Sequence, residues 1–120
     1  MRPAIVNSKV NNAARLDKSF DALSHPVRRT IVERLARGPA TVGEATRGVA
    51  VSKPAVSKHL KVLEEAGLIR REIEGRQHRL TLESRGLNEA TRWIELHRRL
   101  WEAKFDAVER HLTDEDERRN

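Results

Sequence analysis

The chain has 120 residues, and its 24 Lys and Arg against 18 Asp and Glu give a net charge of +6. This length suits one domain of modest core, and the charge favours a polyanionic partner. The 3% aromatic content argues against single-strand binding by stacked rings, and the lack of cysteine excludes disulfides and thiolate metal sites. With no apolar run near the roughly 20 residues of a membrane span and no signal peptide, we expect a cytoplasmic protein without membrane contact.

The N-terminal region is predicted to hold a flexible arm and two helices. Residues 1–12 show no sustained hydrophobic period, so we expect an arm there and a folded domain over residues 13–112. Ala13, Leu16, Phe20 and Leu23 then recur at helical spacing. Ser24 or His25 caps a second helix, which Pro26 opens and Gly38-Pro39 ends. Its outer side carries four arginines, which either form a solvated face or contact phosphates: Arg28, Arg29, Arg34 and Arg37.

Two short helices are predicted next. The first, over residues 41–49, opens with a capping box of Thr41 and Glu44. The second begins after Ser52, a good cap, and ends at Gly67, which supplies the left-handed stop. Too few residues separate the helices for a long antiparallel pair. Two short helices joined by such a tight turn are typical of a helix-turn-helix, whose second helix enters the DNA major groove.

The second of these helices has a polar face that indicates a nucleic-acid partner. Its cations lie in the N-terminal half and its glutamates at the C-terminal end, the reverse of what the helix dipole favours. An anion at the N-terminal end would compensate, although a solvated surface helix could carry the same face. The residues expected to contact DNA from this helix are Ser52, Lys53, Pro54, Ser57, Lys58, His59 and Lys61.

A β-hairpin is predicted to follow. Residues 68–74 and 77–82 are strand-like runs around Gly75 and Arg76, and Ala40 could add a short strand beside them. Arg76 at the tip is our candidate for a minor-groove or phosphate contact, with Arg79 beside it. The predicted fold is mainly α with a small β-hairpin wing, a winged helix-turn-helix.

The stretch VSKPAVSKHLKVLEEAGLIRREIEGRQHRLTL, together with Leu23-Ser24-His25-Pro26-x-Arg28, resembles the ArsR family of bacterial winged-helix repressors. The resemblance is good from about Asp17 to Leu82 and looser beyond. It implies a repressor that binds double-stranded DNA, and a homodimer built from the first and last helices. We expect no cofactor. Thr41 stands where metal sensors of this family carry a cysteine, so arsenic, cadmium or lead sensing by that route is excluded.

The longest periodic segment, about Leu87 to Leu112, is predicted to be a long helix that dimerises. At 1.5 Å per residue it would reach roughly 35–40 Å, more than a domain of this size covers. Large aromatics gathered on one such helix indicate a partner interface rather than packing within the chain. The expected interface residues are Leu16, Phe20, Trp93, Ile94, Trp101, Phe105 and Val108. Residues 113–120 are expected to form a charged, frayed tail.

Neither an active site nor a complete metal site is predicted. There is no glycine-rich phosphate loop and no histidine beside a plausible Ser/Asp pair, so we expect no enzyme. In the family's second metal site, Asp/Glu-x-His is followed by His or Glu 11 and 14 residues later. Glu95, His97 and His111 match three positions, but Val108 occupies the fourth.

Three functional hypotheses remain at this point. The leading one is a homodimeric, sequence-specific repressor of a palindromic operator, which could include its own promoter. The second is a winged helix that binds protein, for which an apolar or acidic recognition face would be expected. The third is a metal-responsive repressor that uses the histidines of the last helix. The operator, the regulated genes and any small-molecule or metal effector are not encoded in recognisable form.

Overall fold

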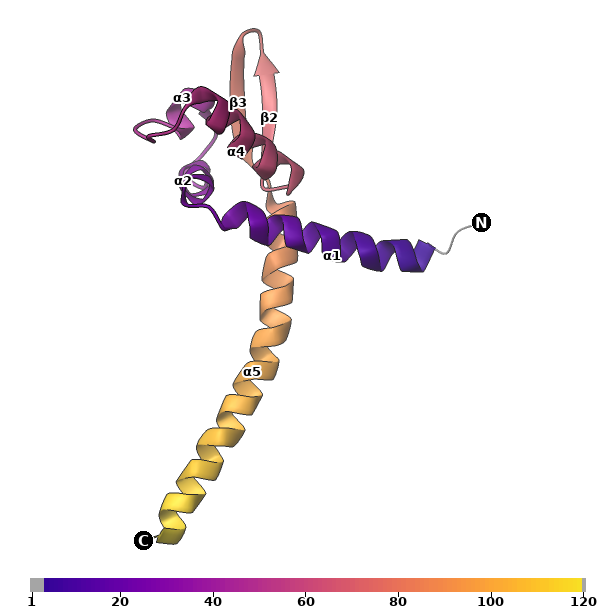
Figure 1. The fold of residues 1–120 in the computed structure, drawn as a ribbon, viewed down its shortest axis with the longest axis vertical. Helices are drawn as coiled ribbons and strands as arrows, with labels where there is room; N and C mark the ends of the chain where they lie inside the picture. Colours follow the sequence, from indigo (N-terminus) through magenta and orange to yellow (C-terminus); the bar gives the residue numbers. More distant parts are fainter. Residues whose placement is uncertain (1–3, 120) are drawn as a thin grey trace. The chain divides into compact units, whose positions relative to one another are not determined.

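The computed structural model describes the backbone of residues 4–119 and the side chains of residues 13–119. The chain divides into two compact units, Met1–Ala90 and Thr91–Asn120. The last helix, α5 (Ser84–Arg119), begins in the first unit and forms the second (Figure 1). Within the described residues, no helix combines the length and the apolar character that crossing a membrane requires.

Helix α1 (Ala4–Leu23) begins earlier than the sequence pattern indicated. Residues 4–12 were expected to form a flexible arm, but their backbone is helical, while residues 1–3 of that arm lie outside the described part of the chain. Residues 4–12 contain neither glycine nor proline. A helix already nucleated by the apolar face after residue 13 can therefore continue back through them at little cost.

Helix α2 (Pro26–Leu35) starts at the proline that the sequence predicts. Its cap is His25 rather than Ser24, because His25 Nδ1 accepts a hydrogen bond of 3.2 Å from the Val27 amide. The imidazole thus satisfies one of the free N–H groups at the start of the helix. Pro26 has no N–H to leave unsatisfied in this turn.

Helices α3 (Val42–Ala45) and α4 (Lys53–Glu65) form the helix-turn-helix. Both predicted caps are confirmed: the capping box of Thr41 and Glu44 is complete, and Ser52 accepts a hydrogen bond from the α4 backbone. The hydroxyl and amide of Thr41 also lower the pKa of the Glu44 carboxyl. Helix α3 is shorter than the predicted residues 41–49, since the chain leaves the helix after Ala45 and passes through a turn.

Helix α4 ends at Gly67, as predicted. Gly67 takes φ +70°, and the amide of Leu68 donates to the Leu63 carbonyl at 3.0 Å. The Gly67 amide donates to the Glu64 carbonyl, also at 3.0 Å. This pair of hydrogen bonds is the Schellman motif, which satisfies the last carbonyls of the helix and turns the chain directly into the next strand.

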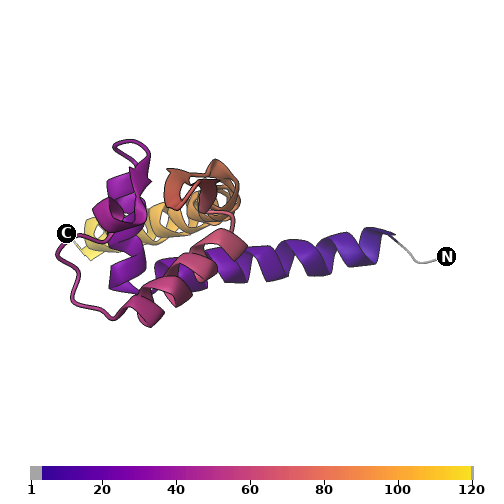
Figure 2. The same ribbon diagram turned by 90° about the horizontal axis from the view of Figure 1, so that it is seen from above.

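The sheet has three antiparallel strands in the order β1-β3-β2. Strands β2 (Ile69–Glu74) and β3 (Gln77–Leu82) form the predicted hairpin, with Ile69 opposite Leu82 and Glu74 opposite Gln77. The short strand β1 (Ala40–Thr41) pairs with β3, which confirms the extra strand expected at Ala40. Figure 2 gives a second view of the hairpin beside the helices of the first unit.

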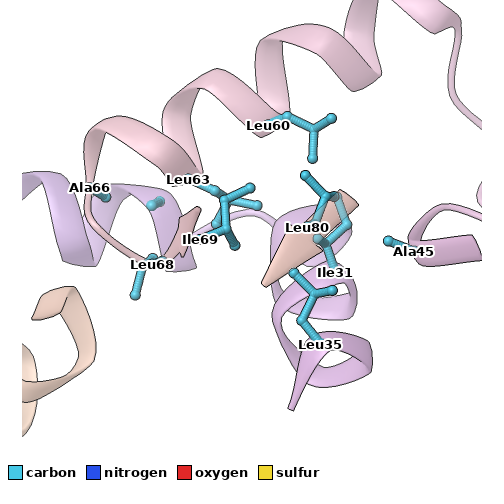
Figure 3. Close-up of a cluster of buried hydrophobic side chains, with 10 residues drawn as sticks. Ile31, Leu35, Ala45, Leu60, Leu63, Ala66, Leu68, Ile69 and Leu80 are labelled. Atoms are coloured by element: carbon cyan, nitrogen blue, oxygen red, sulfur yellow. The ribbon is translucent and has the colours of Figure 1, made fainter. Parts of the chain in front are cut away.

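The core of the first unit lies between the helices and the base of this sheet (Figure 3). Helices α2, α3 and α4 and strands β2 and β3 all contribute fully or almost fully buried side chains. Helix α4 and the wing therefore share one apolar cluster. Its members are Ala22, Ile31, Leu35, Ala45, Leu60, Leu63, Ala66, Leu68, Ile69 and Leu80.

Helix α5 is longer at both ends than predicted. It begins at Ser84, and its first turn approaches the α4–β2 connection so closely that a Cβ on Gly86 would collide with the Ala66 carbonyl oxygen. At the other end, residues 113–119 were expected to be a frayed tail but are helical, and Asn120 lies outside the described residues. A contact of 3.0 Å between His111 Nε2 and Glu115 Oε1, four residues apart, supports this last stretch.

Candidate DNA interface

The exposed face of α4 carries six of the seven residues that the sequence assigns to DNA contact from this helix. No large apolar side chain lies among them. The exposed carboxylate of Glu65 lies at the C-terminal end of the helix, away from the lysines at its start. The opposite face buries Leu60 and Leu63 in the core, which fixes the helix in place. The exposed residues are Ser52, Lys53, Pro54, Ser57, Lys58 and Lys61.

His59 is the seventh predicted contact, and the structure places it differently. Its ring is half-buried, 4.4 Å from the ring of His25 between centroids, and its Nδ1 lies 3.2 Å from Arg28 Nη1. Arginine can only donate, so His59 Nδ1 accepts and the neutral ring carries its proton on Nε2. Burial, and then the charges of His25 and Arg28, lower the pKa of His59 below its usual value of 6.5. This histidine joins α4 to α2.

The arginines of α2 hold the helices together. Arg28 donates from Nε and Nη2 to the carbonyls of Ala22 and Asp21, at 2.8 and 2.9 Å, and so caps the end of α1. Arg34 Nη1 donates to the carbonyl of Arg47 at 2.7 Å, in the turn after α3. Arg29 Nη1 donates to the carbonyl of Leu23 at 2.8 Å, at the end of α1. Three of the four arginines that the sequence left open between solvent and phosphate therefore bind backbone carbonyls of neighbouring elements.

The wing carries a cation at its tip and another on its middle strand. Arg76 follows Gly75, which takes φ +62° at the turn, and its side chain is exposed. Arg79 is also exposed, but in the central strand β3 it stands opposite Glu72 on one side and Thr41 on the other. A facing carboxylate offsets the attraction of Arg79 for phosphate. Of the two, Arg76 is better placed to meet DNA.

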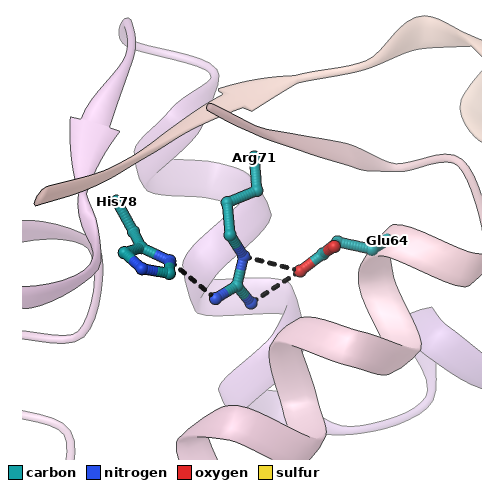
Figure 4. Close-up of polar contacts among 3 residues, drawn as sticks. All are labelled: Glu64, Arg71 and His78. Atoms are coloured by element: carbon teal, nitrogen blue, oxygen red, sulfur yellow. Dashed lines mark hydrogen bonds and ion pairs between the residues drawn. The ribbon is translucent and has the colours of Figure 1, made fainter. Parts of the chain in front are cut away.

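A polar cluster joins the wing to the recognition helix (Figure 4). Arg71 on β2 donates from Nη2 and Nε to one carboxylate oxygen of Glu64 on α4, at 2.6 and 2.9 Å. Its Nη1 lies 3.1 Å from His78 Nδ1 on β3, which therefore accepts. The three side chains hold α4, β2 and β3 in one arrangement. Arg71 therefore has a structural role in the wing.

Comparison with known proteins identifies the fold and its function class. A family model described as a helix-turn-helix domain matches residues 23–72. The transcriptional repressor SdpR of Bacillus subtilis is 30% identical over 79 residues, which cover 66% of this chain and 88% of SdpR. The crystal structure of an ArsR family transcriptional regulator superposes with a TM-score of 0.71 at 34% identity, covering 75% of this chain and 93% of that one. The chain belongs to the ArsR family of DNA-binding transcriptional regulators.

A further relative is similar to part of this ArsR family chain. The HTH-type transcriptional regulator Rv2034 of Mycobacterium tuberculosis is 57% identical over 53 residues, or 44% of this chain. The match covers only half of Rv2034. The relatives named here are transcriptional regulators rather than enzymes, and the winged helix-turn-helix predicted from the sequence is confirmed.

The last helix of this ArsR family chain is lined with exposed apolar side chains. Eight of the ten large hydrophobic residues that are exposed in the described part of the chain lie on α5. Trp93 and Trp101 are both on this helix, with 6.2 Å between ring centroids, and His97 stacks on Trp93 at 4.0 Å. Of the predicted interface residues on α1, Leu16 is half-buried and Phe20 exposed. Which of these side chains meet a second subunit stays a prediction.

The three possible metal ligands on α5 are not brought together within one chain. His97 Nδ1 lies 2.8 Å from the Trp93 carbonyl oxygen, Glu95 binds Arg98 at 2.7 Å, and His111 binds Glu115. His97 and His111 are separated by about 21 Å of helix at 1.5 Å per residue. In the described residues, no group of three or more His, Cys, Asp or Glu side chains could hold a metal ion.

Proposed function

We propose that the protein is a homodimeric repressor that binds a palindromic operator through α4 and the wing. The observation that supports this most strongly is the exposed face of α4, which presents serine and lysine side chains beside a cationic wing tip. A helix of this kind fits the DNA major groove, where side chains reach the base edges. The second hypothesis, a protein-binding winged helix, would need an apolar or acidic face, and α4 offers neither over its N-terminal half.

The contacts that we propose divide into those that read bases and those that bind phosphate. Ser57 can donate to or accept from a base edge, and Lys58 and Lys61 can donate to guanine O6 and N7 or to phosphate. Pro54 can touch a thymine methyl group. Arg76 would bind phosphate or enter the minor groove, and it would do so with little regard to sequence.

We infer that two chains pair through the exposed apolar face of α5, with help from α1. A contiguous apolar surface of this kind marks an interface, and pairing about a two-fold axis closes the assembly with identical surfaces. The two α4 helices would then meet half-sites about one helical turn of DNA apart, which requires an inverted repeat. Bound at a promoter in the cytoplasm, the dimer would block polymerase, including at its own gene.

A selection of duplexes from a random pool, followed by sequencing, tests this proposal. The expected result is an inverted repeat bound by two chains, with affinity that falls steeply as salt rises. Heparin chromatography provides a simple first check, since a DNA-binding protein elutes late and a protein-binding winged helix does not. Recovery of no sequence preference, together with a monomer in sedimentation, would contradict the proposal.

A further inference from the structure

A groove lies between the helix-turn-helix and the wing, within the first unit. Its volume is about 540 Å³, within the range of roughly 300–1,000 Å³ that small-molecule sites occupy. Strand β1, α3, α4 and both strands of the wing contribute to its walls. The lining side chains that matter for the argument are Val42, Val56, Leu60, Lys53, Arg76 and His78.

The groove has an apolar floor and a cationic rim. Val42, Val56 and Leu60 supply hydrocarbon, while Lys53 and Arg76 are exposed at its edges. Among the described residues, neither of these two cations forms an ion pair, and none of the lining residues is acidic. A site of this composition favours a ligand with a hydrocarbon body and an anionic group.

The third cation of the groove has its charge matched within the protein. Arg71 lines the groove, but its Nη2 lies 2.6 Å from a carboxylate oxygen of Glu64, which does not line the groove. Because His78 Nδ1 accepts from Arg71, the neutral His78 ring keeps its proton on Nε2 as a donor. The groove therefore offers two unmatched positive charges and, among its neutral donors, His78 Nε2. This combination suits a small organic anion and does not suit a cation or a metal ion.

We propose that the groove binds a small organic anion, a carboxylate with an apolar body, and that this ligand competes with DNA. The competition with DNA, which is the regulatory half of this inference, rests on the proposed function. Three residues of the proposed DNA interface also line the groove: Lys53, Ser57 and Arg76. A bound anion would cover Ser57 and match the charge of Lys53 and Arg76. DNA release would then follow from direct overlap, with no conformational change required.

The alternative occupant is a DNA phosphate alone. A phosphate would use Lys53 and Arg76 but would gain nothing from the apolar floor, since it carries no hydrocarbon. Octanoate, 1-octanol and acetate separate these cases. Octanoate has both the hydrocarbon chain and the carboxylate, 1-octanol has the chain only, and acetate has the carboxylate with almost no chain. The test is therefore a comparison of three probes on the full chain, first without DNA and then with it.

The first measurement follows backbone amide shifts by NMR during titration with each probe in the absence of DNA. Octanoate is expected to shift the amides of Val42, Gly43, Ser57 and Gln77 in a saturable manner, and acetate is not. Arg76→Ala should weaken octanoate by about two- to fivefold, the range for one exposed charge pair, and leave 1-octanol unchanged. Shifts confined to α5, or equal affinities for octanoate and 1-octanol, would overturn the proposal.

A matched pair of variants tests the charge of the groove without removing a DNA-binding side chain. Gly43 lies on the rim of the groove, has an ordinary φ, and has no atom within 4 Å of an added Cβ. Gly43→Glu places a carboxylate there and should weaken octanoate by about two- to fivefold relative to Gly43→Gln, which has the same shape. Equal octanoate affinities in the two variants would contradict an anion site.

The last measurement is competition on the operator duplex recovered by selection. Sodium octanoate is expected to raise the apparent Kd in proportion to its occupancy of the groove, while equal sodium acetate controls for ionic strength. Identical effects of the two salts would overturn the regulatory half. Failure of the chain to bind any duplex without octanoate would instead refute the proposed function, and the NMR result on the groove would stand separately.

Discussion

Ser57 and Lys61 are two of the α4 side chains that we propose to contact base edges. Both are exposed and lie four residues apart, which places them on the same side of the helix. Removal of a side chain that reads a base weakens binding to the cognate site and changes binding to random DNA little. Removal of a side chain that binds phosphate weakens binding to both duplexes by the same amount.

We predict that Ser57→Ala and Lys61→Ala each weaken cognate binding by about 1–3 kcal/mol and change random-duplex binding little. Arg99→Ala, which removes an exposed cation from α5, controls for net charge. Fluorescence anisotropy on the two duplexes measures the difference. Equal losses on both duplexes would make the residue a phosphate contact, and full cognate affinity in both variants would refute the assignment of this face.

His59 makes stability depend on pH. Its pKa is lowered in the folded chain, chiefly by burial, so the unfolded chain binds the proton more readily. The free energy of unfolding therefore falls as pH drops below the ordinary value of 6.5. We predict that lowering the pH from about 7.5 to about 5.5 destabilises the protein, and that His59→Gln reduces this dependence in urea titrations.

His111→Gln is the control for the His59 experiment, since His111 is exposed on α5 and pairs with Glu115 on the same helix. This variant should keep the pH dependence of the wild type. An unaltered pH dependence in His59→Gln would show that other groups determine it. His59 flanks the apolar face of α4, so its sequence position allows either packing or a phosphate contact, and the contact with Arg28 shows its packing role.

At the scale of the elements, local signals predicted most of the boundaries. The caps at His25, Thr41 and Ser52, and the stop at Gly67, depend on hydrogen bonds within a few residues, which sequence spacing determines. The sequence pattern predicts α1 and α5 too short. The segments at their outer ends are rich in asparagine or in charged residues and carry no apolar period. The close approach at Gly86 depends on a contact with Ala66 that no local pattern indicates.

The bond between Arg71 and Glu64 ties the wing to the recognition helix, and its loss should affect both. The two side chains are 24% and 35% exposed, so the pair contributes only about 0.2–1 kcal/mol to stability. We predict that Glu64→Gln speeds hydrogen exchange in β2 and β3 and lowers DNA affinity, because wing and helix no longer hold one relative position. Exchange measured by mass spectrometry reports the first effect.

Glu65→Gln is the matched control for Glu64→Gln. It makes the same change of charge at the next residue, where the side chain is exposed and does not contact Arg71. The gain of positive charge alone should raise DNA affinity slightly in both variants. A fall in DNA affinity that occurs only in Glu64→Gln therefore results from loss of the ion pair with Arg71. Equal exchange rates in the two variants would refute that role.

For the whole molecule, the proposed dimerisation would determine how the proposed operator is bound. Trp101 lies midway along the apolar face of α5, between Ile94 and Phe105, and remains 46% exposed. A symmetric interface places its anchor there, and truncation of a central tryptophan costs about 2 kcal/mol or more, equivalent to roughly thirtyfold in dissociation. We predict a dimer at micromolar concentration in sedimentation, and a monomer or unfolded chain for Trp101→Ala.

Leu96→Ala is the control for Trp101→Ala, because Leu96 is also exposed on α5 but lies about 140° around the helix from Trp101. This variant should remain a dimer. Trp101→Ala should also lose affinity for the palindrome, although Trp101 is not proposed to touch DNA. A monomer binds each half-site separately, whereas a dimer bound to one half-site holds its second subunit at high effective concentration near the other. Circular dichroism distinguishes a folded monomer from an unfolded chain. A wild-type monomer that fills the two half-sites independently would refute the two-fold assembly.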